Sequence, residues 1–239
     1  MEYPASAPLA GTEPSTRRLN IPRRLSNPRW RPLTEGAPVL VPLLAAGVAA
    51  GFAYRPLAPI ALAAAGAVAF AFRDPERQVR PQRDVAFSPA DGRVIHVGMV
   101  YDEYWETELV EVAIFLALWD VHVQRAPLDG EVVAQVRKAG GYRPAMSTLA
   151  THGNNQLATH LRTAAGPVTV TQISGMVARR IVTWAEQGDH LIQGERLGMI
   201  KFGSQVTLRL PESCTVLVDV GDGVRGGLTP IARVAAVPV

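Results

Sequence analysis

Two textures of hydrophobic and polar positions divide the chain near residue 72. Residues 38–72 are almost wholly Ala, Val, Leu, Gly and Phe, with one polar interruption at Tyr54-Arg55-Pro56. Each arm of this run has about sixteen residues, or about 24 Å as a helix, a little less than a hydrocarbon core of about 30 Å. The pattern predicts a hydrophobic helical hairpin that enters a membrane. A buried Ala-rich hairpin of a soluble domain is the alternative.

After residue 72 the apolar positions form short runs separated by Gly, Pro and Asp. Runs of this length and composition are typical of β-strands. They predict a mainly β domain, a β-rich α+β fold, over residues 73–239. The predicted strands are 85–87, 93–99, 107–123, 131–137, 156–162, 167–173, 177–184, 197–202, 205–210, 215–220 and 231–237.

Two internal echoes organise this β domain. The segment 88–94 (SPADGRV) resembles 126–132 (APLDGEV), and 188–194 (GDHLIQG) resembles 221–227 (GDGVRGG). Glycine supplies positive φ in such turns and aspartate caps its own turn. The echoes predict a compact barrel-like sandwich with strands related by a quasi-twofold axis, resembling lipoyl-type hybrid folds. They also favour a plain turn role for aspartates in these segments.

Residues 1–37 are rich in Pro, Ser, Thr and Arg and lack apolar periodicity, which is typical of a flexible leader. A secretory signal is less consistent with the long basic part and the double apolar run. Arginines crowd both flanks of the hairpin, whereas the turn between its arms carries only Arg55. The positive-inside rule therefore predicts that both flanks lie at the cytoplasmic face of the cell membrane.

Charge and composition exclude several functions. The net charge of +3 is concentrated in the leader, so no basic face suggests a nucleic-acid partner. The five histidines lack the spacing of metal ligands, and Cys214 is the only cysteine, so we expect neither a metal nor a disulfide. Lys138 and Lys201 are the only lysines, which limits every chemistry that needs a lysine amine.

The dipeptide Gly203-Ser204 offers a different chemistry. The Ser204 hydroxyl can attack the preceding carbonyl to form an ester, and β-elimination of that ester would leave a reactive N-terminus. Gly-Ser is also a common turn dipeptide. His122, late in the apolar run 107–123, and Asp91, before Gly92, could complete an Asp, His and Ser set. A core histidine and a turn aspartate remain the plainer interpretations of these two residues.

Five ordered motifs from residue 72 to residue 204 resemble the short, archaeal and bacterial type of phosphatidylserine decarboxylase. The resemblance covers the chain from about Pro38 to its C-terminus. The motifs are FRDPER at 72–77, SPADG at 88–92, DVHVQR at 120–125, ARRIV at 178–182 and GMIKFGS at 198–204.

The resemblance implies a proenzyme that cuts itself between Gly203 and Ser204, which would leave a β chain of residues 1–203 and an α chain of residues 204–239. The α chain would begin with a pyruvoyl group made from Ser204. By the same resemblance, His122 acts as general base on the hydroxyl and Asp91 stabilises the imidazolium. The pyruvoyl ketone would condense with the serine amine of phosphatidylserine and serve as electron sink, and phosphatidylethanolamine and carbon dioxide would be the products. The two chains would stay partners, and an oligomer is possible.

Two other functions remain open. The segment Asn154-Asn155-Gln156 and Gln205 depart from the family pattern, which would permit a pyruvoyl decarboxylase of another amino-acid head group. A membrane-tethered lipoyl-like carrier module would need a lysine at an exposed hairpin tip. Only Lys138 suits that position.

Overall fold

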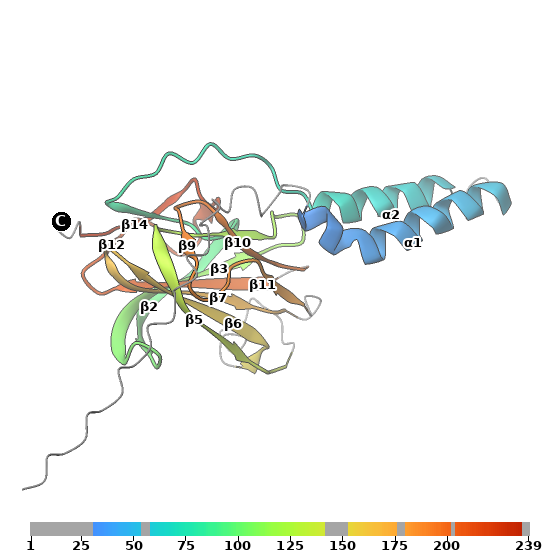
Figure 1. Cartoon of the computed structure of the whole chain (residues 1–239). Helices are drawn as coiled ribbons and strands as arrows, with labels where there is room; N and C mark the ends of the chain where they lie inside the picture. Colours follow the sequence, from blue (N-terminus) through green and yellow to red (C-terminus); the bar gives the residue numbers. More distant parts are fainter. Residues whose placement is uncertain (1–30, 54–57, 142–152, 176–179, 202–203, 236–239) are drawn as a thin grey trace, which may run out of the picture.

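The computed structural model describes residues 31–53, 58–141, 153–175, 180–201 and 204–235. Two N-terminal helices, α1 (Arg31–Ala53) and α2 (Ala58–Ala71), lie side by side and project away from a β domain (Figure 1). Helix α1 begins before the expected start at residue 38 and contains Pro38 and Pro42. The predicted leader lies outside the described residues up to residue 30.

The β domain contains three antiparallel sheets. The largest has eight strands in the order β13-β2-β3-β11-β7-β6-β5-β9, and the two smaller sheets have the orders β1-β14-β12 and β4-β10-β8. A mainly β fold is thereby confirmed, whereas the likeness to lipoyl-type folds stays a prediction. The strands are β1 (Val85–Phe87), β2 (Gly92–Asp102), β3 (Thr107–Leu116), β4 (Val123–Arg125), β5 (Gly130–Lys138), β6 (Gln156–Thr163), β7 (Gly166–Ile173), β8 (Ile181–Thr183), β9 (His190–Leu191), β10 (Arg196–Ile200), β11 (Ser204–Pro211), β12 (Thr215–Val216), β13 (Gly223–Val224) and β14 (Pro230–Arg233).

The strand orders reveal an internal twofold relation. Exchanging β11 with β7, β3 with β6, β2 with β5 and β13 with β9 reverses the large sheet onto itself. The same operation exchanges the two small sheets. Hydrogen bonds repeat accordingly: Phe87 N donates to Pro127 O at 3.0 Å and Arg125 N donates to Pro89 O at 2.8 Å. The two echoed turns thus bond to each other across the axis, a contact that the sequence pattern did not predict.

The second pair of echoes follows the same symmetry. Gly188 N donates to Val132 O and Gly221 N donates to Val94 O, both at 2.8 Å. Each Gly-Asp turn therefore closes the start of one long strand, β5 or β2, and leads into the short strand that pairs with it.

One repeat is inserted into the other. Strands β4 to β10 form a continuous repeat, whereas the other repeat consists of β1 to β3 followed by β11 to β14. The chain passes between the repeats twice, after Leu116 and after Ile200, and these connections are called crossovers; the first comprises residues 117–122 and the second begins at Lys201. In the continuous repeat, β6 and β7 are joined by a tight turn between Thr163 and Gly166. The corresponding strands β3 and β11 pair directly at Leu116 and Ser204, and the whole second repeat lies between them in the chain.

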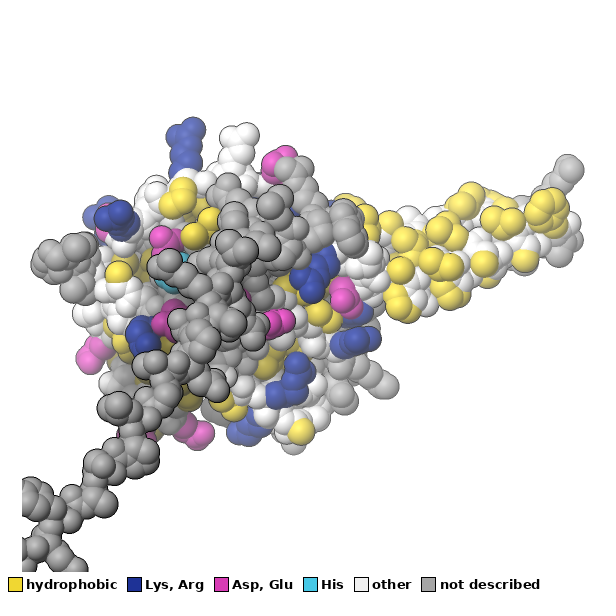
Figure 2. All heavy atoms as spheres, viewed as in Figure 1, with side chains coloured by type: hydrophobic (Ala, Val, Ile, Leu, Met, Phe, Trp, Pro, Cys, Tyr) yellow, Lys and Arg dark blue, Asp and Glu magenta, His cyan; other side chains and the backbone are white. Residues whose placement is uncertain are grey.

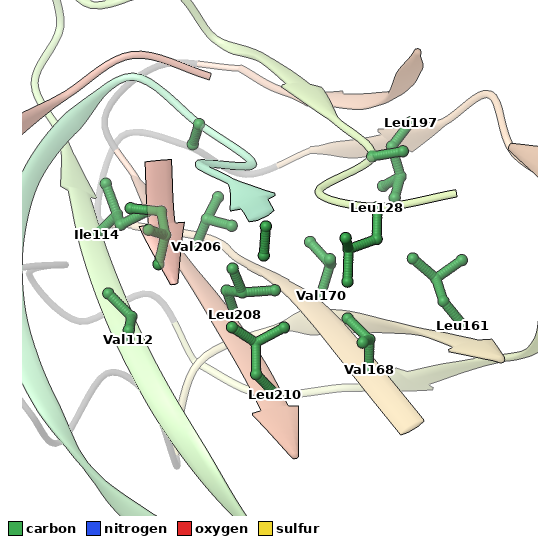
Figure 3. Packing of buried hydrophobic residues seen from close by; sticks show 14 of the residues in the cluster. Val112, Ile114, Leu128, Leu161, Val168, Val170, Leu197, Val206, Leu208 and Leu210 are labelled. Carbon is green, nitrogen blue, oxygen red and sulfur yellow. The ribbon is translucent and has the colours of Figure 1, made fainter. Parts of the chain in front are cut away.

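Alternation along the central strands builds the core between the large sheet and the small sheets. Val206, Leu208 and Leu210 of β11 point to the same side as Val112 and Ile114 of β3 and Val168 and Val170 of β7 (Figure 3). All seven side chains are buried. The intervening residues of β11, such as Gln205 and Thr207, lie on the other face of the sheet, because successive side chains of a strand alternate.

The predicted single strand 107–123 is wrong. Strand β3 ends at Leu116, where Ala117 N donates to the Asp120 carboxylate at 2.8 Å and Asp120 N donates back to Ala117 O at 3.0 Å. This capped turn interrupts the apolar run. His122 therefore lies in the first crossover, directly before β4, rather than at the end of a long strand.

Candidate active site

His122 is fixed at the point where the first crossover meets strands β4 and β10. Its carbonyl accepts hydrogen bonds from Ile200 N at 3.2 Å and from Gln124 Nε2 at 2.9 Å. Its side chain is fully buried, and the backbone of Asp120 and of Ala71, the last residue of α2, both influence its pKa. The imidazole thus lies between the base of the hairpin and the β domain.

Burial lowers the pKa of His122 to about 4. The hydrogen bond with Asp120 raises the pKa, the charge of Arg73 lowers it, and the hydrogen bond with Ala71 and the charge of Asp91 raise it by smaller amounts. Burial dominates because a charged imidazolium loses its hydration inside the protein. His122 is therefore neutral near pH 7 and able to accept a proton.

Ser204 opens strand β11, directly opposite Leu116 of β3. The residue is fully buried, and its Oγ has no hydrogen-bond partner among the described residues. Gly203, the predicted partner in cleavage, lies outside them. Ile200, which bonds to His122, precedes Ser204 by four residues, so their Cα atoms are at most about 14 Å apart. Ser204 thus lies opposite the last residue of β3, and His122 lies beside the last residue of β10.

Asp91 occupies one of the echoed turns. Arg77 donates two hydrogen bonds to the Asp91 carboxylate, at 2.6 and 2.7 Å, and Gly226 N donates a third at 2.8 Å. Both side chains of the ion pair are largely buried. Asp91 acts on His122 through its charge, as the smallest of the five influences on the histidine pKa.

The symmetry-related aspartate shows what is special about Asp91. Asp129 accepts a hydrogen bond from Gln193 N at 2.7 Å, as Asp91 does from Gly226 N. Both residues therefore perform the turn role that the echoes favoured. The arginine partner distinguishes Asp91, and Arg77 belongs to the segment that connects α2 to β1.

Sequence reasoning missed three charged residues around His122. Arg73 donates to Trp119 O at 2.7 Å and to Phe70 O at 2.9 Å, and its charge reaches His122. Asp120 has a raised pKa, chiefly because it is partly buried and also because Asp91 lies near it. Arg77 is the third. Arg73 and Arg77 could have been identified, since both belong to the FRDPER motif.

The same motif ties the hairpin to the strands beneath the site. The buried carboxylate of Asp74 accepts a hydrogen bond from Arg125 of β4 at 2.7 Å and another from Arg196 of β10. A buried carboxylate that binds two guanidinium groups resists movement, because loss of its ion pairs would leave buried charges without partners. The base of the hairpin is thereby anchored to both strands that flank His122.

A cavity of about 370 Å³ lies elsewhere, on the polar face of the large sheet. Its lining includes Tyr104, His160, Thr169 and Arg209. Arg209 is five residues along β11 from Ser204, or about 17 Å at 3.4 Å per residue. Neither His122 nor Ser204 lines this cavity.

Comparisons with known proteins give the chain a family. Residues 65–232 match the family model described as phosphatidylserine decarboxylase. A protein from Methanopyrus kandleri named putative archaetidylserine decarboxylase proenzyme is 41% identical over 189 residues, which cover 75% of this chain and 88% of that relative. A phosphatidylserine decarboxylase proenzyme from Symbiobacterium thermophilum is 38% identical over 201 residues, covering 83% and 94%. Another, from Aromatoleum aromaticum, is 39% identical over 163 residues, covering 68% and 76%. Because the family model matches most of its length and relatives of about 40% identity agree, this chain belongs to the phosphatidylserine decarboxylase family.

Proposed function

We propose that this chain is a self-processing decarboxylase that converts phosphatidylserine to phosphatidylethanolamine and carbon dioxide. The observation that supports the proposal is a fully buried Ser204 opposite Leu116 together with a buried, neutral His122 beside Ile200, at the two connections between the repeats. The proenzyme names of the relatives agree with a chain that must be cut before it acts. The cut is assigned to the bond between Gly203 and Ser204.

The cleavage begins with proton transfer from the Ser204 hydroxyl to His122. The oxygen attacks the Gly203 carbonyl, the C–N bond breaks, and the amide nitrogen takes a proton, so that an ester replaces the amide. Removal of the Ser204 α-proton then expels the Gly203 carboxylate. Water replaces the nitrogen and ammonia leaves, which converts the serine into the pyruvoyl group. General base catalysis of this kind contributes about 10²- to 10⁴-fold to a rate.

Asp91 favours the charged state of His122 during this transfer. Its carboxylate carries the negative charge that raises the histidine pKa, and Arg77 fixes its direction. Because Arg77 neutralises much of that charge, the effect of Asp91 is a modest stabilisation of the imidazolium. The neighbouring Arg73 opposes it.

The surroundings of Ser204 fit a pyruvoyl group. The Oγ atom lies in a dry place without a hydrogen-bond partner among the described residues, and a ketone brings no donor that would need one. When present, the pyruvoyl group supplies the electron sink for loss of carbon dioxide. His122 remains at the same edge, where it returns a proton to the substrate carbon.

The hairpin gives the enzyme its place at the membrane. Its surface is apolar along its length (Figure 2), with Val41, Val48, Phe52 and Ile60 each at least 60% exposed. Over residues 31–49, α1 is long and apolar enough to cross a membrane by length and composition. The part of α1 beyond its base, residues 37–53, is about 25 Å long, which is less than a hydrocarbon core. The hairpin therefore enters the bilayer from the cytoplasmic face without emerging on the other side.

A collar of Phe70, Arg73, Leu118 and Trp119 marks the depth of insertion. The exposed fractions of Phe70, Leu118 and Trp119 are 54%, 51% and 70%, and Arg73 links the segments through Phe70 O and Trp119 O. Tryptophan with a neighbouring cation is typical of the membrane–water interface. His122 and Ser204 then lie at the level of the lipid head groups.

Intact-mass measurement of purified protein tests the proposal. We expect two chains, of residues 1–203 and 204–239, with the smaller chain blocked and one ammonia lighter than a serine-started peptide. Ser204→Ala should remain a single chain. A wild-type protein that stays uncut after fresh purification would refute the assignment.

The substrate is tested separately by release of carbon dioxide. We expect release from phosphatidylserine in vesicles and none from free serine. If carbon dioxide is released faster from a phospholipid with another amino-acid head group, that phospholipid is the substrate instead of phosphatidylserine. A lysine-carrier role would depend on Lys138, which ends β5 and pairs with Gln156 of β6 rather than occupying the tip of that hairpin. Self-association stays a prediction.

A further inference from the structure

Lys201, three residues before Ser204, is bound to the first helix of the hairpin. Its Nζ lies 3.0 Å from Glu35 Oε2 and donates to Glu35 O at 2.6 Å. The two side chains are only 14% and 25% exposed. The backbone N of Lys201 donates to Arg180 O at 3.2 Å, so both ends of this lysine are held.

The second helix holds the other crossover. The backbone of Ala71 at the end of α2 influences the pKa of His122, and Phe72 packs in a buried cluster with Val123 and Met199. The helices meet at their base, where a Cβ on Gly36 would lie 2.8 Å from the Phe72 ring. Such close contact permits no side chain at position 36. The base of the hairpin is therefore one packed unit that contacts both crossovers.

We infer that Glu35 is a positioning residue for self-cleavage. Through Lys201 it anchors the chain just after β10, three residues before Ser204, while the end of α2 packs against Val121 and Val123 on either side of His122. The hairpin thus sets the distance between the hydroxyl and its base in addition to holding the protein at a membrane. This inference rests on the proposed cleavage between Gly203 and Ser204.

The ion pair between Lys201 and Glu35 is buried enough to contribute to the position of Lys201. A typical exposed pair, such as Arg162 with Glu131 at 3.6 Å and 68% and 49% exposure, is screened by water and contributes little. Loss of Glu35 would instead leave a largely buried ammonium without its carboxylate, which costs free energy unless the lysine moves. Displacement of a reacting group by about 1 Å can slow a reaction by about 100-fold.

The rate of self-cleavage of freshly synthesised full-length protein tests the inference. Glu35→Ala and Lys201→Met should each slow cleavage about tenfold or more. Lys201→Arg, which keeps the charge, should recover most of the rate. So should the exchanged pair Glu35→Lys with Lys201→Glu. Glu131→Ala is the matched control and should cleave at the wild-type rate.

A second measurement separates positioning from loss of stability. In the uncut Ser204→Ala background, Glu35→Ala should leave secondary structure intact at the assay temperature. Slow cleavage in a folded variant, recovered by Lys201→Arg and the exchanged pair, supports the inference. Wild-type cleavage in Glu35→Ala, or slow cleavage in the exchanged pair, overturns it. If the wild type is uncut, or Ser204→Ala is cut, the proposed cleavage itself has failed.

Discussion

His122 combines two demands that conflict in most histidines. A base must be unprotonated at the working pH, and burial meets that demand by lowering the pKa of His122 to about 4. A base must also tolerate a proton during the reaction, and the backbone hydrogen bonds and Asp91 serve that end. The residue is neutral at rest and can be charged only transiently.

The same burial makes stability depend on pH. The unfolded chain protonates His122 near pH 6.5, whereas the folded chain does so only near pH 4, so acid favours the unfolded state between these values. We expect the free energy of unfolding to fall by about 2 kcal/mol from this residue between pH 7 and pH 5. Urea unfolding of Ser204→Ala at both pH values, compared with the same protein carrying His122→Gln, measures the difference. An equal fall in both proteins would contradict the assignment.

The twin aspartates offer a control within one molecule. Asp91→Asn and Asp129→Asn each weaken an equivalent turn hydrogen bond, but only Asp91 faces Arg77 and the charge cluster around His122. We expect Asp91→Asn to slow self-cleavage by about threefold to tenfold, partly because it leaves the buried Arg77 without its carboxylate, and Asp129→Asn to change the rate less than about twofold. Rates from denaturing gels decide the matter. Equal effects would reduce Asp91 to a turn residue.

At this scale the sequence predicted identities better than contacts. Ser204, His122 and Asp91 were identified because ordered motifs name them. The pairing of Asp91 with Arg77 and the raised pKa of Asp120 depend on which segments the fold brings together. Hydrogen-bond partners many residues apart leave no periodic signal.

The hairpin and the first crossover form the element that we propose meets the lipid. Leu118 and Trp119 extend the apolar surface of α1 and α2 onto the β domain, and Arg73 connects the two parts. Because Trp119 lies in the same crossover as His122, the depth of the tryptophan fixes the depth of the histidine.

Trp119 should therefore report the membrane directly. Among the four tryptophans, we expect Trp119 to account for much of the fluorescence quenched by vesicles of brominated, partly anionic lipids. Trp119→Phe should remove that part. Trp105→Phe is the control, since Trp105 donates to Thr169 Oγ1 within the β domain and should be insensitive to the lipid. Full quenching in Trp119→Phe would place the loop away from the bilayer.

The sequence predicted strand boundaries well where a clear pattern of apolar and polar residues determines them. The long strands β5, β6, β7 and β11 begin and end within one residue of their predicted limits, because apolar and polar residues alternate clearly along them. The break after Leu116 was missed because the capping carboxylate of Asp120 overrides an apolar run. Strands β9 and β13, of two residues each, carry too little pattern to detect.

The strands on either side of the proposed cleavage site pair with one another throughout the molecule, so cleavage would not separate the two chains. Strand β11 lies between β3 and β7, β13 pairs with β2, and β14 pairs with β1. The proposed α chain thus contributes strands to both the large sheet and a small one, and its β11, β13 and β14 each pair with a strand of the β chain. Its Val206, Leu208 and Leu210 are fully buried in the common core.

We expect the two chains to remain together after cleavage. Size-exclusion chromatography of the processed protein should give one peak that contains both chains, which separate only in denaturant. Burial of apolar surface along β11 opposes dissociation, because each Å² that is buried contributes about 25 cal/mol. Appearance of a free 36-residue chain under native conditions would show that the sheets hold it less firmly than their pairing implies.

The insertion of one repeat into the other also sets the order of events in the life of the molecule. While the chain is whole, β3 and β11 meet by a search within one molecule. Once the bond before Ser204 is gone, the same meeting requires an encounter between two molecules. An unfolded precursor can regain its structure at any dilution, whereas an unfolded mature enzyme could do so only when concentrated. The two separated chains of the mature enzyme would therefore refold together poorly. The mature enzyme lasts only as long as its two chains stay associated.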